Sequence, residues 1–239
     1  MSLQTNGLRI EHMNFAFSAQ AKPFFKEVSL HCAPGMLHFL QGKNGSGKST
    51  FFNILQGHLD SHAQLSGTFS LDNEVTKVEN NQVDTRFTQQ IKTVVQQVDT
   101  MIADQFSVEQ NLQCANLPTY PGLKKLPHAK ELAIIQEFNI DKTKRAEQLS
   151  GGQKQILAIV MALQKPTKLL LLDEPTAALD PKNAHMVIQC LQKLAQELDI
   201  TVLIISHDKE LVLTYAPGQY FEIQQDDSDV RTISVKKIG

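Results

Sequence analysis

Apolar and polar residues alternate over two segments near the start of the chain, residues 8–17 and 24–32. Successive side chains of a strand point to opposite faces, so this pattern predicts antiparallel strands of a half-buried sheet. Residues 36–40 form a nearly continuous apolar run, which is typical of a buried central strand. We expect further strands at residues 66–75 and 91–97.

The second half of the chain alternates between buried strands and helices. Residues 168–175 and 200–207 are apolar runs that predict buried strands. Residues 48–57 predict a helix closed by Gly57, and residues 181–198 predict one with Val187, Leu191 and Leu194 on one face. Residues 220–235 indicate a hairpin around an acidic turn. Alternating strands and helices favour an α/β fold with a mostly parallel sheet covered on both sides.

Residues 107–144 differ from their surroundings, because they are helical in pattern and rich in loops. Three prolines interrupt them, Pro118, Pro121 and Pro127. We therefore expect an inserted helical subdomain at about residues 98–148. The remaining residues, 1–97 and 149–239, would form the core of a single domain.

Composition disfavours several classes of protein. The formal charge of the 239 residues is −2, Trp is absent and aromatic residues make up 6%, which argues weakly against a nucleic-acid partner. Cys32, Cys114 and Cys190 have no zinc or disulfide spacing, which favours a reducing cytosol. No signal peptide is visible, and the longest clean apolar run, Leu169 to Leu172, is far too short to span a membrane. We expect a soluble protein that reaches a membrane only through a partner.

The segment GKNGSGKST, residues 42–50, is a complete phosphate-binding loop between a predicted strand and a predicted helix. Its glycines allow backbone N–H groups to curl around an anion. Lys48 would reach the β- and γ-phosphates, Ser49 would hold Mg²⁺, and Thr50 would add a hydroxyl near the α-phosphate. The residues predicted to contact nucleotide here are Gly42, Lys43, Asn44, Gly45, Ser46, Gly47, Lys48, Ser49 and Thr50.

Two carboxylates end the buried strand LLLLDE, residues 169–174. Buried strands do not end in paired acids unless a nearby group needs the charge. Asp173 suits the Mg²⁺ shell, and Glu174 suits a general base that accepts a proton from the attacking water. Together with the phosphate loop, these residues predict hydrolysis of a nucleoside triphosphate.

A second anion-binding helix start lies about one hundred residues further on, in LSGGQKQILAIVMALQ, residues 149–164. LSGGQ, about twenty residues before LLLLDEP, resembles the signature of ABC ATPases. Gln96 resembles that family's Q-loop glutamine, AALD (177–180) its D-loop, and His207 its switch histidine. The resemblance runs from about Leu8 to Ser234. It implies a phosphate-loop NTPase (RecA-like) core with an N-terminal antiparallel β subdomain.

The family resemblance also implies how the site is completed. Ser150, Gly151, Gly152 and Gln153 would bind the γ-phosphate of ATP held by a second copy of the chain, or by a paralogous ATPase subunit. Asp180 would lie at the seam between the two chains. Gln96 would join Ser49 and Asp173 around Mg²⁺ and would move with the helical subdomain, while His207 would contact the γ-phosphate or orient water. Phe17 lies where the family carries an aromatic residue stacked on adenine.

Two positions depart from the family pattern. Ile156 and Met161 stand where many relatives have arginines, which puts the usual salt-bridge network around this helix in doubt. Ile156, Ile159, Val160 and Leu163 still form an apolar face that supports the helix.

The function that the resemblance implies is the ATP-hydrolysing subunit of an ABC transporter. It would lie on the inner face of the cell membrane, docked on an integral membrane permease and not itself inserted. The sequence leaves open a soluble ABC ATPase that serves an assembly such as iron–sulfur cluster biogenesis. A nucleic-acid-associated ABC protein is disfavoured, because the roughly one hundred residues between the phosphate loop and the signature contain no heptads and no cysteine clusters.

Overall fold

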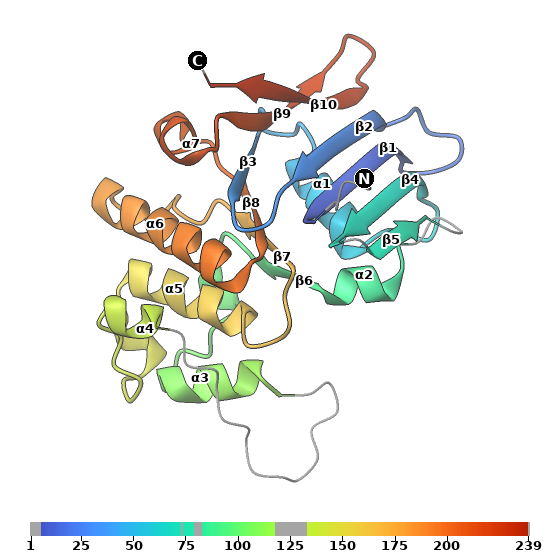
Figure 1. Ribbon diagram of the computed structural model, residues 1–239. Helices are drawn as coiled ribbons and strands as arrows, with labels where there is room; N and C mark the ends of the chain where they lie inside the picture. The colour runs from blue at the N-terminus through green and yellow to red at the C-terminus, as the bar shows by residue number, and fades with distance from the viewer. Residues whose placement is uncertain (1–5, 73, 79–82, 118–132, 239) are drawn as a thin grey trace.

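The computed structural model describes residues 6–72, 74–78, 83–117 and 133–238. Ten strands form one sheet in the order β5-β4-β1-β2-β10-β9-β3-β8-β7-β6. The strands are β1 Leu8–Ala16, β2 Phe25–Cys32, β3 Leu37–Gln41, β4 Gln64–Leu71, β5 Glu74–Lys77, β6 Ile91–Val94, β7 Leu169–Asp173, β8 Thr201–Ile205, β9 Gln219–Gln225 and β10 Arg231–Lys237. Figure 1 shows β1, β2, β4 and β5 gathered on one side of the molecule.

The sheet is mixed, with an antiparallel part at one end. β1 pairs antiparallel with β2 and with β4, and β4 pairs antiparallel with β5. The alternating pattern of residues 8–32 correctly predicted the first pair. β9 and β10 form the hairpin expected around the acidic turn. The predicted parallel core and antiparallel N-terminal part are both present, and they join in one continuous sheet.

The parallel part of the sheet contains β3, β6, β7 and β8. β3 lies between β8 and β9, and β7 lies between β8 and β6, with every one of these pairs parallel. The carboxyl ends of parallel strands meet at one edge of a sheet. The phosphate loop, Gln96, the paired acids and His207 each follow one of these four strands, so the topology brings them to the same edge.

Seven α-helices and two short 3₁₀ helices lie in the described part of the chain. They are α1 Lys48–Gln56, α2 Thr85–Gln89, η1 Val98–Thr100, α3 Val108–Ala115, α4 Ile134–Glu137, η2 Ala146–Gln148, α5 Gly151–Ala162, α6 Pro181–Leu198 and α7 Lys209–Tyr215. Gly57 closes α1 with a φ of 71°, as the sequence predicted. The sequence pattern did not reveal α2 or α7, which are five and seven residues long.

The region expected to be a helical subdomain is described in part. α3 and α4 lie at the lower end of the view in Figure 1, beside α5. The three prolines predicted to interrupt this region, Pro118, Pro121 and Pro127, lie outside the described residues. The strand predicted over residues 91–97 ends at Val94, so Gln96 lies in the loop that follows it.

Two clusters of buried side chains stabilise the fold. One joins α3, α5 and α6 to one face of the parallel strands, and the other joins α1 to the antiparallel strands. The four residues predicted as the apolar face of α5 are buried in the first cluster. Leu157 and Ala158 are also fully buried, so α5 is enclosed on more than one face.

Candidate nucleotide site

The phosphate loop connects β3 to α1 and needs glycine for its shape. Gly45 and Gly47 have φ values of 76° and 105°, and this left-handed conformation is unfavourable for residues that have a Cβ. A Cβ on Gly47 would lie 2.7 Å from Cε1 of Phe24. Both conformation and packing within this chain therefore require Gly47.

A pocket of about 550 Å³ opens over this loop at the carboxyl edge of the parallel strands. It brings together Phe17, two acids, Gln96, His207 and most of the predicted loop residues. The lining residues are Phe17, Phe24, Asn44, Gly45, Gly47, Lys48, Ser49, Thr50, Gln96, Asp173, Glu174 and His207. Four separate motifs predicted from sequence thus line one pocket. Phe24, the residue just before β2, was not predicted.

The ammonium group of Lys48 lies inside the loop. Its Nζ donates hydrogen bonds to the carbonyl oxygens of Gly42 and Lys43, at 2.8 and 3.2 Å. Desolvation lowers the pKa of Lys48, while the charges of Glu174 and Asp173 oppose that shift. This arrangement holds a positive charge where phosphates would enter.

The paired acids are partly withdrawn from water. Desolvation raises the pKa of both Asp173 and Glu174 above their ordinary values. Glu174 Oε1 lies 3.2 Å from Nε2 of His207, and that oxygen is buried without a hydrogen-bond partner. Glu174 also has a φ of 50°, a strained conformation that is concentrated at functional sites.

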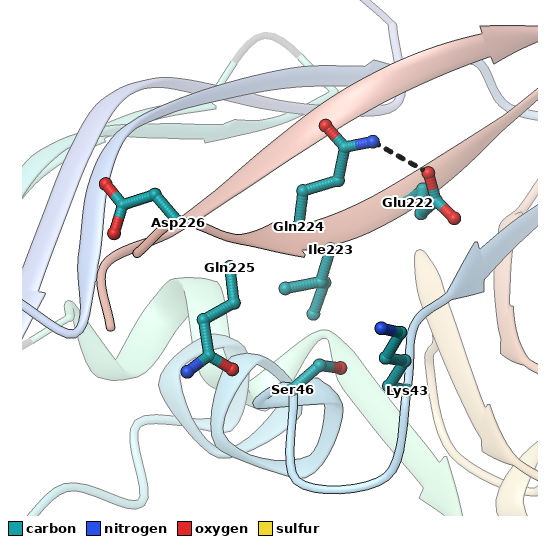
Figure 2. A pocket seen from close by; sticks show the side chains of 7 residues that line it. All are labelled: Lys43, Ser46, Glu222, Ile223, Gln224, Gln225 and Asp226. Carbon is teal, nitrogen blue, oxygen red and sulfur yellow. Dashed lines mark hydrogen bonds between the residues drawn. The ribbon is translucent and has the colours of Figure 1, made fainter. Parts of the chain in front are cut away.

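Lys43 and Ser46 differ from the other loop residues, because their side chains line a second pocket of about 540 Å³. Figure 2 shows both side chains on the side of the loop that faces β9, with Glu222, Ile223, Gln224 and Gln225 opposite. Any contact that these two residues make with nucleotide would therefore use their backbone groups.

The signature LSGGQ forms the start of α5. Ser150 is the N-cap, and its hydroxyl accepts a hydrogen bond from Gln153 N while the Gln153 side chain accepts one from Ser150 N. The hydroxyl proton of Ser150 remains able to donate. The amide of Gln153 also donates to the carbonyl of Phe138 at 3.2 Å, so this side chain orients the helix within its own chain. A nucleotide contact by Gln153 stays a prediction.

Gly151 and Gly152 are not required by contacts within this chain. A Cβ on Gly151 would lie 3.5 Å from Leu179, and one on Gly152 would lie 3.7 Å from Asn183. Both distances are ordinary van der Waals contacts, and neither glycine has a positive φ. The two glycines also belong to a helix, where glycine is less favourable than alanine.

None of Ser150, Gly151, Gly152, Gln153 and Asp180 is among the described residues that line the pocket over the phosphate loop. Asp180 is exposed and caps α6, accepting a hydrogen bond from Asn183 N at 3.0 Å. The structure therefore separates the predicted site residues into two groups within one chain.

An ion-pair cluster surrounds the start of α5 despite the missing arginines. Lys154 Nζ lies 2.6 Å from Asp99 and 3.2 Å from Asp104, and its side chain is 18% exposed. Asp99 lies three residues after Gln96. Ile156, at one of the arginine positions, is fully buried. The sequence raised doubt about a salt-bridge network here, and Lys154 supplies one from a different position.

Comparison with known proteins identifies the class. The family model described as ABC transporter matches residues 25–177. The chain is 31% identical over 219 residues to the tyrosine transport ATP-binding protein of Clostridioides difficile, covering 87% of this chain and 85% of that protein. The chain belongs to the ABC transporter ATP-binding family.

Two other relatives are named as import ATP-binding proteins. The chain is 30% identical to the methionine import ATP-binding protein MetN of Streptococcus agalactiae, with 86% of this chain aligned to 58% of that protein. It is 30% identical to the phosphonates import ATP-binding protein PhnC of Paraburkholderia xenovorans, with 88% of this chain and 72% of that protein covered.

Solved structures show the same fold. The structure of cbiO1 from Clostridium perfringens, part of the cbiONQ transporter complex, matches with a TM-score of 0.75 at 25% identity, covering 98% of this chain and 89% of that one. A dimeric ATP-binding cassette in a post-hydrolysis state with ADP and phosphate matches with a TM-score of 0.67 at 23% identity, covering 97% and 99%.

These matches confirm the family that the motifs indicated. The protein is an ABC ATPase that binds and hydrolyses ATP as the ATP-binding subunit of an ABC transporter. No helix in the described ranges combines the length and apolar character that a bilayer crossing needs.

Proposed function

We propose that two ATP-binding subunits enclose ATP between the phosphate loop of one chain and the signature helix of the other, and that this closure powers a separate membrane permease. The second subunit would be a copy of this chain or a paralogue. A two-fold arrangement would form two such sites. Loss of the γ-phosphate would then remove the contact that holds the opposite helix, so the dimer would open.

The observation that carries this proposal is the pair Gly151 and Gly152. Each has room for a Cβ within its own chain, and Gly151 is exposed while Gly152 is buried, so the absence of a side chain at Gly151 suits an approach from outside the chain. The N–H groups of these residues precede the first intrahelical bond, from Lys154 N to Ser150 O at 2.8 Å. Donors at a helix start favour an anion, and a γ-phosphate is one.

The roles within one chain follow from the pocket. The backbone N–H groups of the phosphate loop and Lys48 would bind the phosphates, and Phe17 would stack on adenine. Glu174 would accept the proton of the attacking water, with His207 beside it. Asp180 would lie at the seam between the chains.

The residues present also fit Mg²⁺. Ser49, Gln96 and Asp173 are among the residues that line the pocket, and each offers an oxygen ligand, which is the donor type that Mg²⁺ prefers. No group of three His, Cys, Asp or Glu side chains placed to hold a metal ion by itself occurs in the described part of the chain. This fits an ion that shares its ligands with nucleotide phosphates. Mg²⁺ would neutralise charge on those phosphates.

The transport partner would be an integral membrane permease, with this subunit on the inner face of the membrane. The relatives named for methionine and phosphonate import support inward transport. They also favour transport over a soluble role in iron–sulfur cluster assembly. Purification of the native complex separates these functions, because a permease copurifies in the first case and soluble scaffold proteins in the second.

Size-exclusion chromatography of Glu174→Gln tests the proposal. This variant should keep ATP affinity and lose the general base, so excess ATP with Mg²⁺ should convert monomer to dimer. ADP should leave it monomeric. A variant that binds ATP yet elutes as monomer at every ATP concentration would refute the two-chain site.

A further inference from the structure

Phe24 packs against both Phe17 and the phosphate loop. It lines the pocket with Phe17, whereas the other ten lining residues belong to the phosphate loop or to the groups proposed for hydrolysis. The Phe17 and Phe24 ring centroids are 4.8 Å apart with an interplanar angle of 74°. Aromatic rings in this arrangement attract each other edge to face. The apolar end of the pocket thus consists of two rings.

The backbone of Phe24 is fixed on both sides. Its N–H donates to the carbonyl of Phe15 in β1 at 2.7 Å, and its carbonyl accepts from Arg231 N in β10 at 2.9 Å. Its ring also packs against the phosphate loop, where Gly47 leaves no room for a Cβ. Phe24 therefore connects the aromatic end of the pocket to the loop that would bind phosphates.

Arg231 holds the Phe24 ring from the other side. Its Cζ lies 4.0 Å from the Phe24 ring centroid, within the range of a cation–π interaction. The Nε atom of Arg231 is buried without a hydrogen-bond partner, and the Arg231 guanidinium also donates to the carbonyl of Asp229. Packing against the Phe24 ring is thus a main contact of the partly buried Arg231 guanidinium. Arg231 comes from the C-terminal hairpin, about two hundred residues from Phe24 in sequence.

We propose that Phe24 is a second base-binding residue, which contacts the purine together with Phe17, and that Arg231 is a positioning residue that fixes the Phe24 ring. This inference rests on the proposed nucleotide site. It adds a contact from Phe24, the residue just before β2, and a supporting residue from β10 to a base site in which the sequence suggested only Phe17. The C-terminal hairpin thereby takes part in nucleotide binding without touching nucleotide.

Calorimetric titration with ADP and with inorganic pyrophosphate tests this inference, because only ADP carries a base. ADP is not turned over, so binding is measured without hydrolysis. Phe24→Leu keeps an apolar group against Gly47 and removes the aromatic face. We expect its Kd for ADP to rise about tenfold, while its Kd for pyrophosphate stays at the wild-type value.

Arg231→Met keeps an apolar stem over the ring and removes the cation. Its Kd for ADP should rise about threefold with no change for pyrophosphate, and Arg231→Lys should recover part of the loss. Phe106→Ala removes a ring that is 43% exposed and lies outside the pocket, so it should bind both ligands as wild type does.

Two results would overturn the inference while leaving the proposed function intact. One is a Phe24→Leu protein that binds ADP with wild-type affinity. The other is an equal loss of ADP and pyrophosphate affinity, which would mean that Phe24 only shapes the phosphate loop. A wild-type protein that binds neither ligand would instead refute the proposed site itself.

Discussion

His207 Nε2 lies 3.2 Å from Glu174 Oε1, at the point where β8 and β7 end side by side. The Glu174 side chain is 16% exposed and that of His207 is 47% exposed. A carboxylate withdrawn from water beside an imidazole is suited to accept a proton from water and to keep that water oriented. The pair therefore forms the proposed hydrolytic centre.

His207→Ala should lower kcat for ATP hydrolysis by about a hundredfold or more while preserving ATP binding. Steady-state kinetics together with equilibrium binding measure both effects. His62→Ala is the matched control, since His62 is an exposed histidine outside the pocket and should leave kcat unchanged. Wild-type kcat in His207→Ala would show that the imidazole has no role in the chemical step.

The acid limb of the pH–rate profile should report on Glu174. Desolvation raises the pKa of Glu174 above its ordinary value of 4.5, and the base must be ionised to act. The rate should therefore fall as pH drops through that raised pKa. The charge of His207 lowers the Glu174 pKa, so the Glu174 pKa should be higher in His207→Ala. The residual rate of this variant should therefore fall at a higher pH than the wild-type rate does. A shift to lower pH would contradict the pairing.

Gly151→Ala should separate stability from function. A Cβ fits at this position, so the fold should be unharmed or stabilised by up to about 1 kcal/mol, as expected for alanine in a helix. The added methyl group would meet the approaching γ-phosphate, so ATP-dependent dimerisation and ATPase activity should fall. Urea unfolding and chromatography with ATP measure the two effects. Loss of stability together with activity would mean that Gly151 serves only its own chain.

Ile156→Arg introduces the residue that many relatives have at this position. It should nevertheless lower the unfolding free energy by about 3 to 5 kcal/mol, because Ile156 is fully buried and a charge there has no partner. Met161→Arg is the control at the second departure. Met161 is only partly buried, so the change should cost about 1 kcal/mol or less. Equal unfolding free energies for the two variants would contradict this account.

Lys154→Met should lower the unfolding free energy by about 1 kcal/mol, because both acidic partners are well exposed and such pairs are weak. The difference from wild type should shrink in high salt. Hydrogen bonding to Asp99 raises the pKa of Lys154 above 10.5, so the contribution persists at neutral pH and is lost as pH rises through that raised value. Lys165→Met, a partly buried lysine, is the control.

The sequence predicted most of the site, because its motifs lie at the ends of strands. The phosphate loop, the paired acids and His207 each follow an apolar run, and parallel strands place their carboxyl ends together. Phe24 was missed, since no sequence pattern shows whether an aromatic residue just before a strand lines a pocket or packs in the core. Its partner Arg231 is distant in sequence, so only the folded sheet shows their contact.

Some boundaries and contacts also required the structure. α2 and α7 are too short to show a helical period. The burial of α5 on more than one face was hidden, because the apolar residues of one face do not reveal that Leu157 and Ala158 are buried as well. The ion pairs of Lys154 depend on how the loop after Gln96 packs against α5, which no local spacing specifies.

Complementation between two inactive variants tests the central claim most directly. Lys48→Ala disables the phosphate loop, and Gly151→Asp places a negative charge where the γ-phosphate of the other chain would lie. Each variant alone should have almost no ATPase activity. An equal mixture should recover roughly a quarter of the wild-type rate, because half of the dimers pair an intact loop with an intact signature at one site. A mixture no more active than the sum of the separate variants would contradict a site shared between two chains.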